Sequence, residues 1–459
     1  MKFGGSCTGV NVAAGADIQT ALNANPAGTT FCLAAATYRI QIPLVPQNNQ
    51  QIIGVTGQTD LNGSQVVTGF SQSGSFFSAT GFLPSTPTPA YDDQCVGGVS
   101  GCGYNEAVYM DNKPLLRVMS LSALTTGHFY EDYGANKIYL ADNPNGHTVE
   151  QAVAPSIINS GASGVVVKNL IVEKAANRAQ IAAINAGNNG ATGWDVENNE
   201  VRLNHTYGIM VDAGIIKSNH IHDNGQLGVD GHMTGGTLAN NEIDHNGSWA
   251  NFSPGWEAGG AKFANAINWD FNGNNSHDNT GAGLWCDESC YGVIMENNTV
   301  TNNDGGIFYE ISYNGIIRNN KASNNGPATT NGFYTPANIW ISASPNTEVY
   351  GNTVSGANGI GLLQQDRSAN VAPYGPHEIH DDYIHDNTIT ITTVPSFAAG
   401  LSQDVGDQSY FTSRNNRFVH NTYHLPDQTS VWFTWMDNGQ TKAGWMNLGE
   451  DTTGTFLTP

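Results

Sequence analysis

Charged residues and long apolar runs are scarce in this sequence. Only 12% of the 459 residues are charged, which is too few for the polar faces of many amphipathic helices and excludes a mainly helical protein. No run of about 18 apolar residues exists, so no membrane-spanning helix is expected. The start, MKFGGSC, lacks an apolar leader segment and is interpreted as a mature chain with an added Met.

Basic residues are the rarer charged type, with 17 Lys and Arg against 39 Asp and Glu and a net charge of −22. This charge repels nucleic-acid phosphates and anionic membrane surfaces, so neither is an expected partner. A polyanionic glycan would need calcium or a local basic cluster to bind. The balance favours a neutral polysaccharide or oligosaccharide as substrate and leaves the oligomeric state open.

Cysteine is also rare, but its six copies are even in number and locally paired. This pattern predicts disulfides and an oxidising compartment, so we expect a secreted, extracellular protein. The connectivity stays open at this point. The disulfide candidates are Cys95 with Cys102, Cys286 with Cys290, and Cys7 and Cys32 around the first ordered segment.

An asparagine turn followed by a hydrophobic residue recurs along the chain, with several intervals of 20 to 23 residues. A period near 22 with short β-type runs predicts a solenoid in which each repeat is one coil of a parallel β-helix. Asn suits such turns because it tolerates left-handed backbone and its amide can form ladders between coils. The turn positions are Asn169, Asn199, Asn219, Asn241, Asn275, Asn298, Asn320, Asn352, Asn387 and Asn416.

The repeat does not cover the whole chain, which predicts four parts. Residues 1–55 form an N-terminal cap with a short amphipathic helix over 16–28 and the first coil. Residues 56–155 alternate apolar and polar side chains around tight turns, as in hairpins of a small β insertion. Residues 156–425 form the β-helix with the active-site cleft, and 426–459 form a C-terminal cap rich in Trp.

A glycine opens a strand in each of five coils, and side chains then alternate between the two faces. One face is apolar or small. The other combines carboxylates, one imidazole, one amine and aromatics beside the longest inserted loops, which is typical of a saccharide cleft. An ordinary charged surface strand is the alternative. The outward residues are Met210, Asp212, Asp230, His232, Lys262, Ala264, Trp285, Asp287, Phe308 and Glu310.

Asp287 and Glu310 occupy the same column one coil apart. Stacked parallel strands lie about 4.8 Å apart, so the carboxyl groups should lie roughly 5 Å apart, which matches the separation in retaining glycosidases. Lys262 is expected to favour ionised Asp287, the nucleophile. Glu310, exposed to the charge of Asp287, is expected to have a raised pKa and to act as the acid/base.

Further side chains around this pair are predicted to bind substrate. Aromatic rings can stack on sugar faces, and acids or an imidazole can bind hydroxyl groups. No metal is predicted, because Cys286 should face the core and the surrounding acids are poor zinc ligands. The predicted substrate-binding residues are Trp285, Phe308, Lys262, Glu257, His232, Asp230, Asp212 and Tyr313.

The segments GWEAGGAKF, GLWCDESCYGVIMENNTV and GGIFYEISYNGIIRNN, within 256–320, carry a family resemblance. They resemble the catalytic region of right-handed parallel β-helix glycoside hydrolases of the pectate-lyase superfamily, and especially the retaining β-helix β-xylosidases. The resemblance implies a right-handed helix, hydrolysis of a xylan-type or related β-glycan, Asp287 as nucleophile and Glu310 as acid/base. The cysteines around Asp287 depart from the family pattern and leave the substrate open.

Two other functions remain as alternatives. A polysaccharide lyase acting on a uronate polymer would bind calcium through Asp212 and Asp230 and use Lys262 as base. A glycan-binding β-helix without catalysis would use the same face only to hold sugar. The hydrolase itself is expected to need no cofactor, whereas calcium would be required by the lyase.

Overall fold

Each coil of the chain contributes short strands that pair in parallel with the equivalent strands of the next coil. The computed structural model describes residues 7–187, 190–327 and 336–458. The chain divides into unit 1, Met1–Asp230 with His245–Ala258, and unit 2, Gly231–Asp244 with Gly259–Pro459. The first six residues, on which the interpretation of the chain's start rests, lie outside the described residues. The four-part division stays a prediction.

Unit 1 contains β1 (Val10–Val12) and the expected helix near the N-terminus, α1 (Ile18–Ala24), in which Asp17 accepts a hydrogen bond from Thr20 N at 3.0 Å. Its coils form three parallel stacks. They are β2 (Thr30–Leu33), β4 (Gln51–Ile53), β16 (Val166–Lys168), β19 (Asp195–Glu197) and β22 (Ile215–Lys217); β15 (Ile158–Asn159), β18 (Ala182–Asn185) and β21 (Tyr207–Asp212); and β3 (Thr37–Arg39), β5 (Asp60–Asn62), β17 (Ile171–Glu173), β20 (Glu200–Arg202) and β23 (His220–His222).

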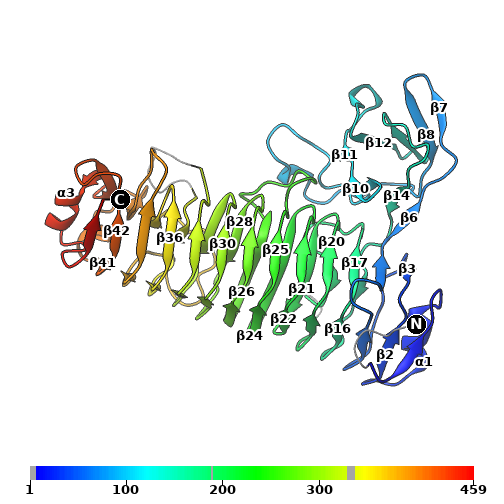
Figure 1. Cartoon of the computed structure of the whole chain (residues 1–459), viewed down its shortest axis with the longest axis horizontal. Coiled ribbons are helices and arrows are strands. Elements are labelled where there is room, and N and C mark those ends of the chain that lie inside the picture. The colour runs from blue at the N-terminus through cyan, green and yellow to red at the C-terminus, as the bar shows by residue number, and fades with distance from the viewer. Residues whose placement is uncertain (1–6, 188–189, 328–335, 459) are drawn as a thin grey trace. The chain divides into compact units, whose positions relative to one another are not determined.

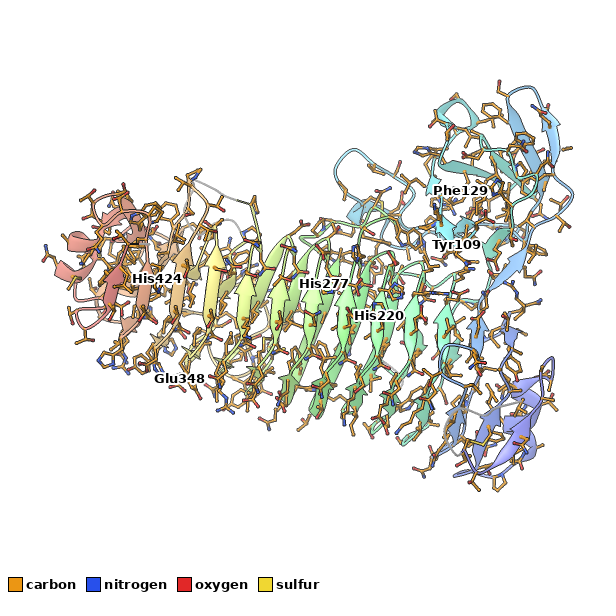
Figure 2. All side chains as sticks on the ribbon, viewed as in Figure 1. Tyr109, Phe129, His220, His277, Glu348 and His424 are labelled. Carbon is orange, nitrogen blue, oxygen red and sulfur yellow. A yellow bond between two sulfur atoms is a disulfide. The ribbon has the colours of Figure 1, made fainter. Side chains whose placement is uncertain are left out.

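The expected β insertion follows β5 and forms two mostly antiparallel sheets with their own apolar core. Figure 2 labels Tyr109 and Phe129 on these strands; Phe129 is buried in that core, whereas Tyr109 packs against Leu203 and Trp249 of the coils. Two 3-10 turns, Asp92–Gln94 and Leu121–Ala123, lie in the connections. The strands are β6 (Ser64–Val66), β7 (Ser71–Ser73), β8 (Phe76–Thr80), β9 (Val108–Met110), β10 (Lys113–Pro114), β11 (Leu116–Arg117), β12 (His128–Asp132), β13 (Lys137–Leu140) and β14 (Val149–Ala152).

Unit 2 repeats the three-stack arrangement, and Figure 1 shows its strands following one another in a regular row. The first stack, called the site stack below, is β26 (Gly259–Asn272), β28 (Ala282–Asp287), β31 (Gly305–Glu310), β34 (Ile339–Ser342), β37 (Ile360–Gln364), β40 (Ala399–Gln403) and β43 (Val431–Trp435). The end of β26 opens the second stack, with β29 (Ile294–Glu296), β32 (Ile316–Arg318), β35 (Glu348–Tyr350), β38 (Tyr383–His385) and β41 (Arg417–Val419). The third is β25 (Glu242–Asp244), β27 (Asn275–His277), β30 (Thr299–Thr301), β33 (Lys321–Ser323), β36 (Thr353–Gly356), β39 (Thr388–Ile391), β42 (Thr422–His424) and β45 (Thr455–Leu457).

Among the described residues, three further elements of unit 2 lie outside the parallel stacks, and β24 (Leu227–Ala239) includes residues of both units. The outside elements are α2 (Ser409–Thr412), β44 (Asn438–Thr441) and α3 (Lys442–Asn447). Near the C-terminus, Trp435 and Trp445 are buried against Phe433 and Phe418, so these tryptophans are core residues. No helix in the described ranges is long and apolar enough to cross a membrane.

The predicted alternation of side chains is confirmed in the site stack. Leu284 and Cys286 of β28 and Ile307 and Tyr309 of β31 are fully buried, so these positions face the interior of the coil. Strand pairing aligns Leu284 with Ile307 and Cys286 with Tyr309. The residues between them therefore face outward, which places Asp287 and Glu310 on the same outer face.

Asparagine ladders connect successive coils at the turns. In unit 2, Nδ2 of Asn298 donates to Oδ1 of Asn320 at 2.9 Å, and Nδ2 of Asn320 donates to Oδ1 of Asn352 at 3.0 Å. Asn274 and Asn421, rather than the expected Asn275 and Asn416, occupy the ladder at two turns. In the run NGNNSH, for example, neighbouring asparagines cannot be assigned from sequence to within one position.

Replacing a ladder residue should destabilise unit 2. Asn320 is 1% exposed, and its side chain bonds Asn298, Asn352 and the carbonyl of Met295. Asn320→Ala leaves buried polar groups unpaired and should lower the free energy of unfolding by about 1–3 kcal/mol in urea titrations. Asn447→Ala, at an exposed helical position, is the control. Equal stability of the two variants would contradict a structural role for the ladder.

Candidate active site

The structure brings Asp287 and Glu310 to neighbouring positions at the ends of β28 and β31. Trp285 pairs with Phe308 and the next residue, Cys286, pairs with Tyr309, so the same register puts the two carboxylates side by side. The strand spacing of about 4.8 Å then fixes the separation of their backbones. Each carboxylate meets a different cation.

Lys262 neutralises Asp287. Its Nζ lies 3.0 Å from Oδ2 of Asp287 and 4.2 Å from the centre of the Trp285 ring. Only 12% of the Lys262 side chain and 14% of the Asp287 side chain are exposed, so water screens this pair less than a surface pair. The contact holds the Asp287 carboxylate against the ammonium group at the end of β28.

Glu310 lies in a less polar position. It is 7% exposed, and burial together with the charge of Asp287 raises its pKa to about 7. Arg367 contacts its Oε1, and Arg367 and Lys262 both oppose the rise. Because burial has the largest effect, the pKa of Glu310 lies well above the ordinary value of a glutamate, and the group exchanges its proton near neutral pH.

Arg367 is a site residue that sequence reasoning missed. It belongs to the site loop, defined here as residues 365–382 between β37 and β38, which is the longest polar insertion in the coils. Tyr313 O–H donates to the carbonyl of Gly375 at 2.7 Å, and Ser289 O–H donates to that of Val371 at 3.2 Å. A single Arg within QQDRSANVAPYGP was the available signal, but no periodicity relates this loop to the strands.

The aromatic side chains of the site stack on one another. Phe308 lies between Trp285, at 5.1 Å, and Trp340, at 4.0 Å between ring centres. Lys262 and Phe308 both lie against the ring of Trp285, and two indole rings flank Phe308. The expected stacking of Trp285 and Phe308 on sugar rings therefore does not fit the structure. The row instead supports the strand ends that carry the carboxylates.

Tyr313 also has a different role from the one expected. It is 2% exposed, its hydroxyl holds Gly375, and its ring packs 5.3 Å from Tyr374 and 5.2 Å from His377. This residue anchors the site loop rather than offering a hydroxyl to substrate. The aromatic contacts fix the segment that brings Arg367 to Glu310.

The remaining predicted substrate-binding residues are divided between the units. In unit 1, Glu257 accepts hydrogen bonds from the Tyr207 hydroxyl and, at 3.0 Å, from Gln180. The charges of Glu257 and Asp230 raise the pKa of the buried Tyr207, after the larger effect of burial. Asp212 and Asp230 are buried, at 2% and 8% exposure.

His232 lies in unit 2 on β24. Its carbonyl, not its ring, accepts the hydrogen bond that the Trp269 indole donates at 3.3 Å. Its assignment to substrate binding stays a prediction.

Two of the three expected cysteine pairs are disulfides, Cys7–Cys32 and Cys95–Cys102. The third pair is not, because Cys286 and Cys290 are free and buried. Cys290 Sγ donates to the carbonyls of Phe263, at 3.3 Å, and Asp287, at 3.4 Å. Thiol hydrogen bonds, not a disulfide clamp, hold the turn after the nucleophile candidate.

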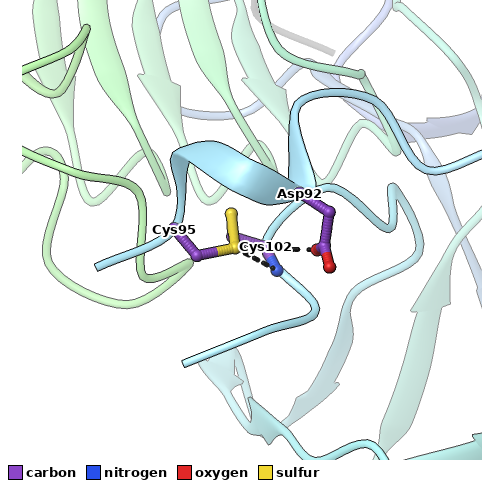
Figure 3. Close-up of side chains that lie close together, drawn as sticks. All are labelled: Asp92, Cys95 and Cys102. Carbon is purple, nitrogen blue, oxygen red and sulfur yellow. Dashed lines mark hydrogen bonds between the residues drawn. A yellow bond between two sulfur atoms is a disulfide. The ribbon is translucent and has the colours of Figure 1, made fainter. Parts of the chain in front are cut away.

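Asp92, Cys95 and Cys102 in the β insertion lie close enough together to suggest a metal site (Figure 3). The two sulfur atoms are bonded to each other, and Oδ1 of Asp92 accepts from the N–H groups of Gly101, at 2.8 Å, and Gly103, at 3.1 Å. A disulfide sulfur is not a thiolate ligand. The cluster is therefore a closed structural loop.

Comparison with known proteins defines the fold. The family model "Right handed beta helix region" matches residues 182–353, and the chain is an all-β protein built on a right-handed parallel β-helix. No curated protein sequence matches it. A solved structure described as XylC in complex with xylose is 16% identical, with 90% of this chain and 83% of that chain covered and a TM-score of 0.72.

A second similar structure is the A-module of the mannuronan C-5 epimerase AlgE4 of Azotobacter vinelandii. It is 11% identical, with 96% of this chain and 94% of that chain covered and a TM-score of 0.54. At these identities both likenesses concern the fold alone. The activity has to be argued from the side chains of the site.

The state of the cysteines can be tested by alkylation. In the native protein Cys286 and Cys290 are buried, so iodoacetamide should label neither. In denaturant without reductant, mass mapping should find label on these two and none on the four disulfide cysteines. Unlabelled Cys286 and Cys290 after denaturation would mean that they form a third disulfide.

Proposed function

We propose that the chain is a secreted retaining glycoside hydrolase that acts on neutral β-linked saccharides of the xylan type. The observation that carries the proposal is the Asp287–Glu310 pair on adjacent strands, in which Lys262 of β26 contacts Asp287 and the pKa of Glu310 is raised to about 7. The resemblance of this region to β-helix β-xylosidases, and the fold shared with a protein solved with xylose, support the substrate class. Two disulfides support secretion.

In the first step, the Asp287 carboxylate attacks the anomeric carbon of the sugar. The bond from that carbon to the leaving oxygen breaks, and Glu310 gives its proton to the leaving oxygen. The product is a covalent glycosyl ester on Asp287 and a free alcohol. Lys262 holds the Asp287 carboxylate in place before attack, and the pKa of about 7 keeps Glu310 protonated in a useful fraction of molecules.

In the second step, Glu310 acts as a base. It removes a proton from a water molecule, the water oxygen attacks the anomeric carbon, and the ester bond to Asp287 breaks. Asp287 leaves as a carboxylate and Glu310 is protonated again. Two inversions at one carbon give a product with the anomeric configuration of the substrate.

The lyase alternative has less support. As a general base, Lys262 would have to lose its proton, yet its Nζ lies 3.0 Å from the carboxylate of Asp287, which favours the charged ammonium. The net charge of −22 also opposes a uronate polymer. No cofactor is proposed for the hydrolase, and calcium belongs to the lyase alternative.

Substitution of either carboxylate should abolish turnover of an aryl β-xyloside. Asp287→Ala removes the nucleophile and Glu310→Ala the acid/base, so each should lower kcat by about 10²–10⁴-fold or more. Glu288→Gln, the exposed neighbour of Asp287, is the matched control and should keep the wild-type rate. Unchanged hydrolysis in both alanine variants, or first products of inverted configuration by NMR, would contradict the proposal.

The pH profile should report Glu310. Its proton is needed in the first step, so kcat/KM should fall about tenfold per pH unit above a pKa of about 7. Arg367 lowers this pKa, so Arg367→Met should move the alkaline limb to higher pH. A limb that stays in place, or moves to lower pH, would show that Glu310 does not control it.

A further inference from the structure

A cavity of about 670 Å³ opens beside the site loop in unit 2 and has no role in the two catalytic steps. Its volume falls within the roughly 300–1,000 Å³ of small-molecule sites. Both the loop and the site stack contribute walls. The residues that matter for its chemistry are Gln364, Asp366, Arg367, His377, Asp404 and Tyr410.

His377 is the unusual member of this wall. It is 5% exposed, yet within the described residues neither ring nitrogen has a hydrogen-bond partner. Burial and the nearby Arg367 charge lower the pKa of His377, so the neutral ring offers one donor and one acceptor. Buried polar atoms without partners are costly, and a ligand hydroxyl in the cavity would satisfy them.

Arg367 connects the cavity to the catalytic pair. It contacts Glu310, while its Nε is buried without a partner among the described residues. On β34, Ser342 pairs with Glu310, and its hydroxyl is likewise buried and unpartnered. Polar groups without partners thus continue from Glu310 toward the cavity.

These unpartnered polar groups run in the same direction as the leaving group of the proposed reaction would extend. The nucleophile lies on β28 and the acid on β31, one coil later, so the leaving oxygen lies on the β31 side. The leaving group then extends over β34 and β37. Two strand spacings beyond Glu310 amount to about 10 Å, which brings linked sugar rings to Gln364 and the cavity.

The charges of the cavity select against acidic sugars. The single guanidinium of its wall, Arg367, already contacts Glu310, and Arg414 pairs with Glu378 at 2.5 Å. Carboxylate oxygens accept hydrogen bonds from sugar hydroxyls but repel uronates. The carboxylates that line the cavity are Asp366, Glu378, Asp404 and Asp407.

We propose that this cavity is a leaving-group subsite that binds neutral sugar units on the reducing-end side of the cleaved bond, with His377 hydrogen-bonded to a hydroxyl. The inference rests on the proposed hydrolase function and deepens it. Oligosaccharides long enough to reach the cavity are then better substrates than short aryl glycosides.

The test compares His377→Phe, which keeps a ring against Tyr313 but removes both ring nitrogens, with wild type on 4-nitrophenyl β-xyloside and on β-linked xylose di-, tri- and tetrasaccharides. Wild-type kcat/KM should rise with chain length. In the variant it should fall about tenfold on the tri- and tetrasaccharides, the effect of about one lost hydrogen bond, and stay within about twofold on the aryl glycoside. His380→Ala, in the same loop but paired with Asp381 at 2.9 Å, is the matched control.

A second variant guards against misfolding, because His377 is buried. Asp404 is exposed at the cavity wall, so Asp404→Ala should fold and should also lower only the oligosaccharide rates. Equal loss on all substrates, or no dependence of the wild-type rate on chain length, would overturn the subsite while leaving the hydrolase intact. Aryl glycoside cleavage that does not need Asp287 would instead overturn the proposed function.

Discussion

The distance between hydrogen-bonded parallel strands controls the rest of the structure. Since this spacing is about 4.8 Å, one coil's turn, inward residue and outward residue each lie directly over those of the next. The asparagine ladder, the Trp285–Phe308–Trp340 row and the Asp287–Glu310 pair are three results of the same repeat. The backbone separation of Asp287 and Glu310 is thereby set by strand pairing rather than by side-chain packing.

Two carboxylates in equivalent positions acquire different properties because their neighbours differ. Lys262 reaches diagonally across the coil to Asp287 and is held over the Trp285 ring. Glu310 is enclosed by the site loop, and burial outweighs the opposing charge of Arg367. The coil supplies the positions, Lys262 pairs with Asp287, and burial raises the pKa of Glu310 to about 7.

Periodic features were predictable from the sequence, and features that depend on a loop were not. The interval between asparagine turns and the alternation after each glycine were enough for the fold and for the outward position of Asp287 and Glu310. Arg367 and His377 lie in the site loop, whose path over the strands has no repeat. The prediction that Trp285 and Phe308 stack on sugar was wrong because the rings stack on each other, which depends on side-chain rotamers. The predicted Cys286–Cys290 disulfide was wrong because a short sequence separation does not determine disulfide geometry.

The site loop also has a consequence for how such a protein can change. Asp287 and Glu310 belong to coils whose spacing is fixed by every neighbour, whereas residues 365–382 connect β37 to β38 and lie outside the strand pairing. An exchange of this one segment would alter the cavity and the Arg367 contact without shifting the register of the strands beneath. In the proposed hydrolase, specificity for the leaving group would therefore change by evolution or engineering at a place where the scaffold tolerates variation.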